Sequence, residues 1–154
     1  MPYLFSYGSN NITQLSQRLK RNILKSEIIP AYIEDYTRIF CFYSSKWNGS
    51  VASIYPDKHK LVFGSLIMLN EKELRKLDKF ETNYTRKMIK VNDNYFNKIN
   101  AHVYICNDTK FVKEPSVEYL NNIKKNIYES WKIKTKIVPI YIKNKQGIQL
   151  YKND

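Results

Sequence analysis

The sequence has few of the residues that mark secreted, membrane-spanning or metal-binding proteins. It contains only two cysteines in 154 residues, Cys41 and Cys106, which are too few for a disulfide framework and lack the spacing of metal ligands. No apolar run approaches the ~18 residues that a membrane-spanning helix needs. The start, Met1-Pro2-Tyr3, has neither a basic flank nor a long apolar stretch, so we expect no secretory signal. These absences predict a cytoplasmic protein with no membrane partner.

The usual marks of metal or cofactor chemistry are also missing. His59 and His102 lie far apart in the sequence, with no cysteine or carboxylate at ligand spacing, and we interpret both as ordinary surface or core histidines. The chain has four glycines and contains neither the Walker pattern nor the dinucleotide-binding glycine pattern. We therefore expect no metal and no cofactor.

Positive charge is present in excess. Lys and Arg number 26 against 14 Asp and Glu, and the net charge of +12 first suggests a nucleic-acid partner. Only five of these cations are Arg, however, and the 26 Lys and Arg residues together are spread over both halves of the chain. AT-rich codons specify Lys, Asn, Ile and Tyr, so coding bias alone can produce this composition. We favour a solvated lysine surface and keep nucleic-acid binding as the weaker alternative.

Hydrophobic patterning predicts one α+β domain over residues 1–154. About six strands are expected, at Leu4–Tyr7, Ile28–Tyr43, Ser50–Tyr55, Leu61–Leu69, Tyr84–Val91 and Ile99–Cys106. About three helices are expected: one after Asn10, one capped by Asn70 and Glu73 with Leu74, Leu77 and Phe80 as its buried stripe, and one opened by Pro115-Ser116.

These elements do not alternate strictly, which favours a mixed, closed sheet (a small β-barrel) flanked by the helices. Residues 132–154 are a poorly defined C-terminal extension, in which residues 137–142 fit either a strand or a short helix broken by Pro139.

Two segments could carry chemistry. In the first, Leu4 to Asn10, a strand enters a tight turn just before a helix, and the unpaired N–H groups of such a turn form a site for a carboxylate or phosphate. The alternative is an ordinary turn with an Asn cap. In the second, Glu81 sits at the end of a helix beside Phe80 and Tyr84. The helix carbonyls and the apolar neighbours both favour a protonated carboxyl, as a general acid or base requires, although a solvated Glu is the simpler interpretation.

Together these segments resemble the gamma-glutamylcyclotransferase family. Leu4-Phe5-Ser6-Tyr7-Gly8-Ser9-Asn10 is similar to the family's F-x-Y-G-S-N signature. Further similar segments follow in the same order: Pro30 to Phe42, Trp47 to Ile54 (W-x-G-x-A-x-I), Val62 to Leu66 (V-x-G-x-L), Glu73 to Glu81 (E-L-x-x-L-D-x-x-E) and Pro115 to Tyr119 (P-S-x-x-Y). The resemblance covers residues 3 to 131. The chain departs from the family at Thr82, where Gly is usual, at Asn11, where an apolar residue is usual, and in residues 124–131, which replace a Gly-rich segment.

The resemblance implies an enzyme that releases 5-oxoproline from a gamma-glutamyl amino acid or gamma-glutamylamine, with glutathione the least favoured substrate because relatives specific for it usually carry Leu at the position of Asn10. It implies Glu81 as the catalytic residue and assigns substrate binding to a larger set: Leu4, Phe5, Ser6, Tyr7, Gly8, Ser9, Asn10, Tyr84 and Tyr119. Asp78 is the rival carboxylate, although we expect it to bond backbone or Arg86. A non-catalytic binding module of the same fold is the main alternative to an enzyme. The expected partner is a small gamma-glutamyl compound, and the expected state is a monomer or homodimer.

Overall fold

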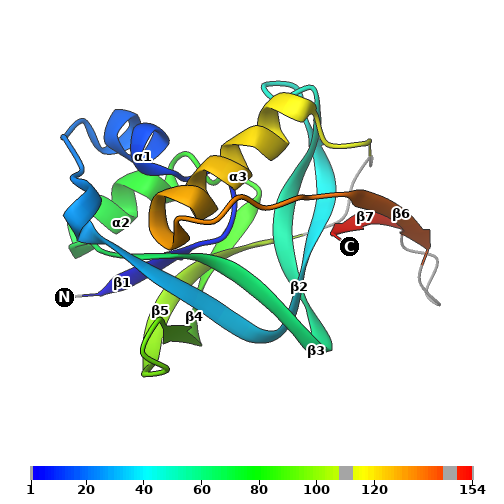
Figure 1. Ribbon diagram of the computed structural model, residues 1–154. Coiled ribbons are helices and arrows are strands. Elements are labelled where there is room, and N and C mark those ends of the chain that lie inside the picture. Colours follow the sequence, from blue (N-terminus) through cyan, green and yellow to red (C-terminus); the bar gives the residue numbers. More distant parts are fainter. Residues whose placement is uncertain (1, 108–112, 144–148, 154) are drawn as a thin grey trace.

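The computed structural model describes residues 2–107, 113–143 and 149–153, and its central element is a closed ring of five strands (Figure 1). The ring runs β3-β1-β5-β4-β2 and closes by pairing of β2 with β3. The five strands are β1 (Tyr3–Ser6), β2 (Ile28–Ser44), β3 (Gly49–Met68), β4 (Tyr84–Asp93) and β5 (Lys98–Cys106). Only the β1–β5 pair is parallel; the other pairs are antiparallel. The predicted mixed, closed sheet is therefore confirmed.

Three α-helices cover one side of this barrel (Figure 1): α1 (Ile12–Leu19), α2 (Glu71–Asp78) and α3 (Val117–Trp131). A short 3-10 helix, η1 (Lys25–Glu27), leads into β2. Asn70 and Glu73 form the predicted capping box of α2. Leu74 and Leu77 are fully buried as expected, but Phe80 is 51% exposed, because α2 ends before it.

The predicted strands 50–55 and 61–69 are one continuous strand, β3. The sequence between them, Pro56 to Lys60, has the polar character of a turn. In the structure the β2–β3 pairing passes from Tyr36↔Pro56 to Glu34↔Leu61, so this segment is held in a bulge opposite Asp35. The register of the β2–β3 ladder shifts across the bulge, but pairing continues beyond it and the strand does not end there.

The C-terminal extension forms a hairpin of β6 (Pro139–Lys143) and β7 (Gln149–Asn153), which residues 144–148 connect outside the described part of the chain. This outcome decides between the two interpretations of residues 137–142 in favour of a strand. β7 pairs with β2 at Ile39 and Phe40, so the hairpin extends the sheet beyond the barrel. With β6 and β7 added to the five strands of the ring, the described chain has seven strands rather than about six.

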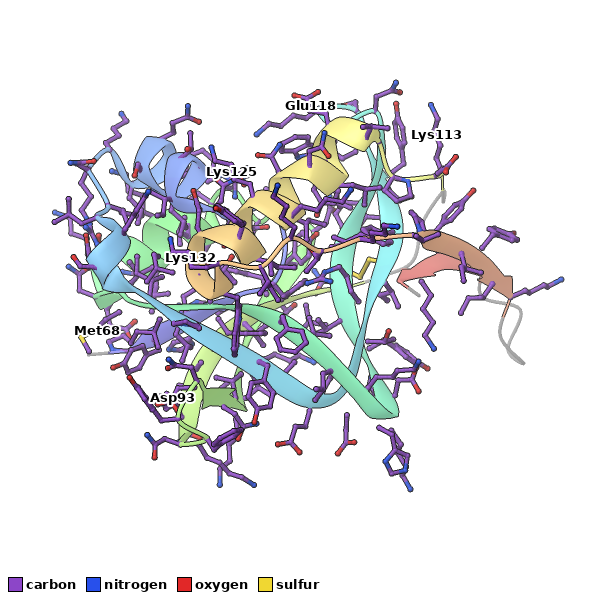
Figure 2. The ribbon with its side chains drawn as sticks, viewed as in Figure 1. Met68, Asp93, Lys113, Glu118, Lys125 and Lys132 are labelled. Atoms are coloured by element: carbon purple, nitrogen blue, oxygen red, sulfur yellow. A yellow bond between two sulfur atoms is a disulfide. The ribbon has the colours of Figure 1, made fainter. Side chains whose placement is uncertain are left out.

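A close backbone approach fixes β1 against β3, and a disulfide joins β2 to β5. A Cβ atom at Gly64 would lie 2.2 Å from the backbone oxygen of Ser6, so only glycine lets β3 approach β1 this closely. Cys41 on β2 and Cys106 at the end of β5 are joined by a disulfide, visible as the yellow bond in Figure 2. It is a single bridge rather than a framework, and the sequence spacing did not indicate it.

Candidate functional site

The structure brings all ten predicted site residues around one cavity, which we call the inner cavity. Its lining comprises Leu4 to Asn10, Glu81, Tyr84 and Tyr119, together with Ala52 and Tyr104. The turn after β1 supplies one wall, the segment after α2 supplies Glu81, and α3 supplies Tyr119. The roles of these residues stay predictions, but their juxtaposition from three distant parts of the sequence is a finding.

The turn is held in place from three directions. Ser6 Oγ donates a 2.8 Å hydrogen bond to the carbonyl of Asn10, closing the turn on itself. From α3, the buried Asn126 donates through Nδ2 to the carbonyl of Ser6 at 3.1 Å. From β2, Arg38 donates through Nη2 and Nε to the carbonyl of Tyr7, at 2.8 and 3.1 Å. The turn is therefore fixed before any ligand arrives.

The carbonyls of this turn are bonded, whereas three of its backbone N–H groups have no acceptor among the described residues. In the described part of the chain, no group accepts a hydrogen bond from the backbone N–H of Gly8, Ser9 or Asn10. The cap of α1 is Asn11, which is 1% exposed and accepts from Gln14 N at 3.0 Å. The helix therefore has the Asn cap that the ordinary-turn interpretation expects, but the cap is Asn11, while the side chain of Asn10 bonds Glu81 and Arg18. Capping also gives the departure at Asn11 a structural explanation.

Arg38 places a buried positive charge directly behind the turn. Its side chain bonds only carbonyl oxygens, those of Tyr7 and Phe63, and none of the described carboxylates lies within 4 Å of it. Burial lowers the pKa of Arg38 to about 10, which leaves it charged at neutral pH. A buried cation without a counter-ion favours an anion nearby, so the charge of Arg38 and the free amides of the turn both favour a carboxylate in the inner cavity.

Glu81 lies just past the end of α2, where its N–H bonds to the Leu77 carbonyl at 3.2 Å. Its carboxylate is only 11% exposed. Asn10 Nδ2 donates to Oε1 at 3.0 Å, and Arg18 Nη1 donates to the same oxygen at 2.9 Å. Arg18 also donates to Asn10 Oδ1 at 3.1 Å, so the three side chains form a closed triangle. The expected apolar surroundings of Glu81 are therefore only partly present, since a cation from α1 contacts it.

Asp78, the rival carboxylate, is occupied elsewhere. It accepts from Arg86 Nε at 2.9 Å and from Arg86 Nη2 at 3.2 Å, which confirms the expected Arg86 partner. It also accepts from the hydroxyl of Tyr104 at 2.7 Å. These contacts use its oxygens to tie α2 to β4 and β5, and Asp78 does not line the inner cavity.

Two tyrosines bracket Ala52 at the back of the cavity. The hydroxyl of Tyr84 donates to the Ala52 carbonyl at 2.7 Å, and the hydroxyl of Tyr119 accepts from the Ala52 N–H at 2.8 Å. Burial raises the pKa of both hydroxyls above the ordinary value, so both keep their protons at neutral pH. Because Tyr119 accepts from the backbone, its own O–H proton is available to an oxygen in the cavity.

Lys113, Lys125 and Lys132 are exposed and lie at separate points along α3 and just beyond its two ends (Figure 2). Across residues 2–107, 113–143 and 149–153, no group of three or more His, Cys, Asp or Glu side chains could hold a metal ion. No helix in the described part of the chain is long and apolar enough to cross a membrane.

Sequence reasoning missed Arg18, Arg38 and Asn126. No pattern in the residues around Arg18 or Arg38 indicates a role in the site, because the chain has many other Lys and Arg residues. Asn126 lies on the same face of α3 as the apolar residues Ile123 and Ile127. A polar residue on such a face is unusual, and this could have indicated that Asn126 bonds a buried group.

Comparison with known proteins gives one family. The family described as "Gamma-glutamyl cyclotransferase, AIG2-like" matches residues 4–132, which end at α3 and exclude the β6–β7 hairpin. A comparison with curated protein sequences finds no match.

Solved structures share the fold. One described as a gamma-glutamyl cyclotransferase has a TM-score of 0.73 and 21% identity, over 84% of this chain and 79% of that one. An uncharacterised human protein gives 0.68 and 24% identity, over 80% and 79%. A protein from Arabidopsis thaliana gives 0.58 and 23% identity, over 85% and 88%. At these identities the likeness shows the fold, and the match over residues 4–132 shows the family: the chain belongs to the AIG2-like gamma-glutamyl cyclotransferases.

Proposed function

We propose that the protein is a cyclotransferase that cleaves gamma-glutamyl compounds and releases 5-oxoproline. The α-amine of the glutamyl group attacks its own γ-carbonyl carbon. A five-membered lactam forms, the bond from that carbon to the side-chain nitrogen breaks, and a free amine or amino acid leaves. Membership of the family supports this reaction class.

The inner cavity supplies what ring closure needs. The α-carboxylate binds at the free N–H groups of Gly8, Ser9 and Asn10, with the charge of Arg38 behind them. Tyr119 donates its O–H proton to an oxygen of the substrate. Holding the glutamyl chain curled makes the attack intramolecular, and well-oriented intramolecular reactions reach effective molarities on the order of 10⁵ M or more.

Glu81 moves the proton. The attacking nitrogen must lose one proton and the departing nitrogen must gain one, and a carboxylate between them can take the first and return it to the second. The observation that carries the proposal is that Glu81, held by Asn10 and Arg18, faces the same cavity as the anion-binding turn.

The test is 5-oxoproline release from a panel of gamma-glutamyl amino acids, gamma-glutamylamines and glutathione. Glu81→Gln keeps the shape and the Asn10 contact but cannot carry the proton, and we expect its turnover to fall roughly 10²–10⁴-fold. Asp78→Asn is the matched control: its carboxylate bonds Arg86 and Tyr104, so we expect a lower free energy of unfolding with kcat nearly retained. Full turnover by Glu81→Gln, with loss in Asp78→Asn, would transfer the role to Asp78.

One observation favours a second candidate, a binding module without turnover. Arg18 and Asn10 already donate to the same oxygen of Glu81, at 2.9 and 3.0 Å, so this oxygen is occupied before any substrate binds. Substrate binding by calorimetry, with no 5-oxoproline from any compound in the panel, would support the module. The cytoplasmic location and the monomer or homodimer state stay predictions.

A further inference from the structure

A second hollow adjoins the inner cavity on the far side of Glu81. This outer cleft lies between the β2–β3 turn and the segment that follows α2. It shares Ser9, Glu81, Tyr84 and Tyr119 with the inner cavity. The carboxylate of Glu81 therefore stands at the boundary of the two spaces.

If the proposed function holds, this boundary fixes where the two halves of the substrate lie. The departing nitrogen must be within hydrogen-bond reach of Glu81 to receive its proton. The glutamyl half fills the inner cavity, so the group attached to that nitrogen extends into the outer cleft. The chemistry of the outer cleft then selects the leaving group.

Three aromatic side chains form the apolar part of a cleft that also has many polar lining residues. Trp47 packs edge-on against Tyr119 with ring centroids 5.1 Å apart, and Phe42 packs in the same manner against Tyr84 at 5.5 Å. Phe80 is 51% exposed at the rim although it is a large apolar residue. Such walls suit a leaving group with an apolar or aromatic body.

The charges that line the outer cleft do not balance. They are the cations Arg18 and Lys46 and the single carboxylate Glu81, two positive against one negative. Glu81 is already paired with Arg18. Lys46 Nζ lies 5.3 Å from the centroid of the Trp47 ring, and no carboxylate of the described residues lies within 4 Å of it. Burial, and then the neighbouring Arg18, lower the pKa of Lys46, as expected where positive charge is in excess.

We propose that the outer cleft binds an α-amino acid as the leaving group, with its carboxylate between Arg18 and Lys46 and an apolar or aromatic side chain against Trp47 and Phe80. In an α-amino acid the carboxylate is attached one carbon away from the departing nitrogen. A carboxylate beside a nitrogen at Glu81 therefore also lies beside Arg18, whose Nη1 is 2.9 Å from Glu81 Oε1.

This geometry disfavours the other leaving groups. A simple amine has no anion to balance Lys46 and Arg18. The ε-linked lysine isopeptide carries its carboxylate at the far end of four methylenes, together with a second ammonium that the two cations repel. The carboxylate of the dipeptide released from glutathione lies one residue further out.

The experiment compares two substrates that differ only in the carboxylate: gamma-glutamyl-phenylalanine and gamma-glutamyl-phenethylamine. We expect kcat/KM for 5-oxoproline release to be about tenfold higher for the first, the lower end of the range for a charge-assisted contact because the cleft is partly open to solvent. Lys46→Gln should reduce this ratio to about threefold or less. Lys132→Gln is the matched control, since Lys132 also lies over an aromatic ring, that of Tyr128, but outside the cleft; its ratio should equal that of the unmodified protein.

Equal kcat/KM values for the two substrates, or a higher value for the amine, would overturn the inference while leaving the cyclotransferase activity intact. If neither compound yields 5-oxoproline, the proposed function fails. Calorimetric binding of the same two compounds then tests whether the outer cleft binds a carboxylate. Tighter binding of gamma-glutamyl-phenylalanine, with the difference lost in Lys46→Gln, would support the subsite without turnover. Equal binding would overturn it.

Discussion

The two walls of the site are built differently. The turn wall, Ser6 to Asn10, is packed from behind: Ser6 is 4% and Tyr7 is 5% exposed, and the carbonyls of the wall are bonded by Arg38 and Asn126. The helix-end wall, Phe80 to Asn83, is mostly exposed, and of its side chains only Glu81 is held by bonds to other side chains.

The contrast matches what each wall is proposed to bind. The turn wall is proposed to bind the glutamyl group, which is the same in every gamma-glutamyl substrate, so a rigid, preorganised surface suits it. The helix-end wall borders the outer cleft, where the leaving group varies between substrates. Stability and substrate binding are therefore expected to depend on the turn wall much more than on the helix-end wall.

The largest effect is expected at Gly64, which lets β3 approach the turn wall. Gly64→Ala places a Cβ 2.2 Å from the Ser6 oxygen, a backbone atom that cannot move aside alone. Overpacking of this kind costs about 3 kcal/mol, the upper end of the usual range, and should lower the melting temperature by roughly 6–12 °C. Thermal unfolding followed by circular dichroism measures it.

Gly8→Ala is the matched control within the same wall. The new Cβ would have as its nearest neighbours Tyr119 Oη at 3.7 Å and Ala52 Cβ at 3.9 Å, which are ordinary contacts. The melting temperature should hardly change, although the methyl group narrows the inner cavity. If the two variants unfold at the same temperature, the packing behind the turn wall is less rigid than the structure indicates.

An intermediate effect is expected at Arg38. Arg38→Met removes the donors to the Tyr7 and Phe63 carbonyls and the positive charge behind the anion site. We expect KM for a gamma-glutamyl substrate to rise about tenfold, the effect of about 1.4 kcal/mol, with a smaller change in kcat. Steady-state kinetics test this, with Arg75→Met on the exposed face of α2 as the control. An unchanged KM would mean that the turn binds its anion without Arg38.

The smallest effect is expected on the helix-end wall. Phe80 contributes little buried area, and its identifiable contact is the Arg18 guanidinium, 5.1 Å from the ring centroid. Phe80→Ala should therefore cost at most about 1 kcal/mol in the free energy of unfolding, measured by urea denaturation. A loss as large as that of Gly64→Ala would remove the contrast between the walls.

Elements near the site could be predicted from the sequence where a few consecutive residues determine them. Asn70 and Glu73 mark the start of α2 because a capping box needs only four consecutive residues. The turn at Tyr7 to Asn10 and the carboxylate of Glu81 were predictable for a similar reason, since each lies in a short motif that resembles the family. The closed sheet followed from the order of strands and helices.

The rest depends on distant contacts. Arg38 reads as a surface cation in the sequence, and only the pairing of β2 with its neighbours buries it under Tyr7. Phe80 fits the helical spacing of Leu74 and Leu77, but the helix stops at Asp78, and spacing alone does not fix a C-terminus. Residues 50–55 and 61–69 were expected to be two strands, yet they form one strand, and the β2–β3 ladder accommodates the segment between them as a bulge.

β1 is the shortest strand of the ring. It holds β3 and β5 together, and the turn of the site follows it directly in the chain. It lies between β3 and β5, pairing Tyr3 with Met68 on one side and with Ala101 on the other. The seven-residue signature therefore has no binding surface by itself, because its amides face a cavity only when residues from positions 38, 64, 81 and 126 surround it. A graft of this seven-residue segment onto another scaffold would therefore not transfer the site, because the site needs the whole barrel together with α1, α2 and α3.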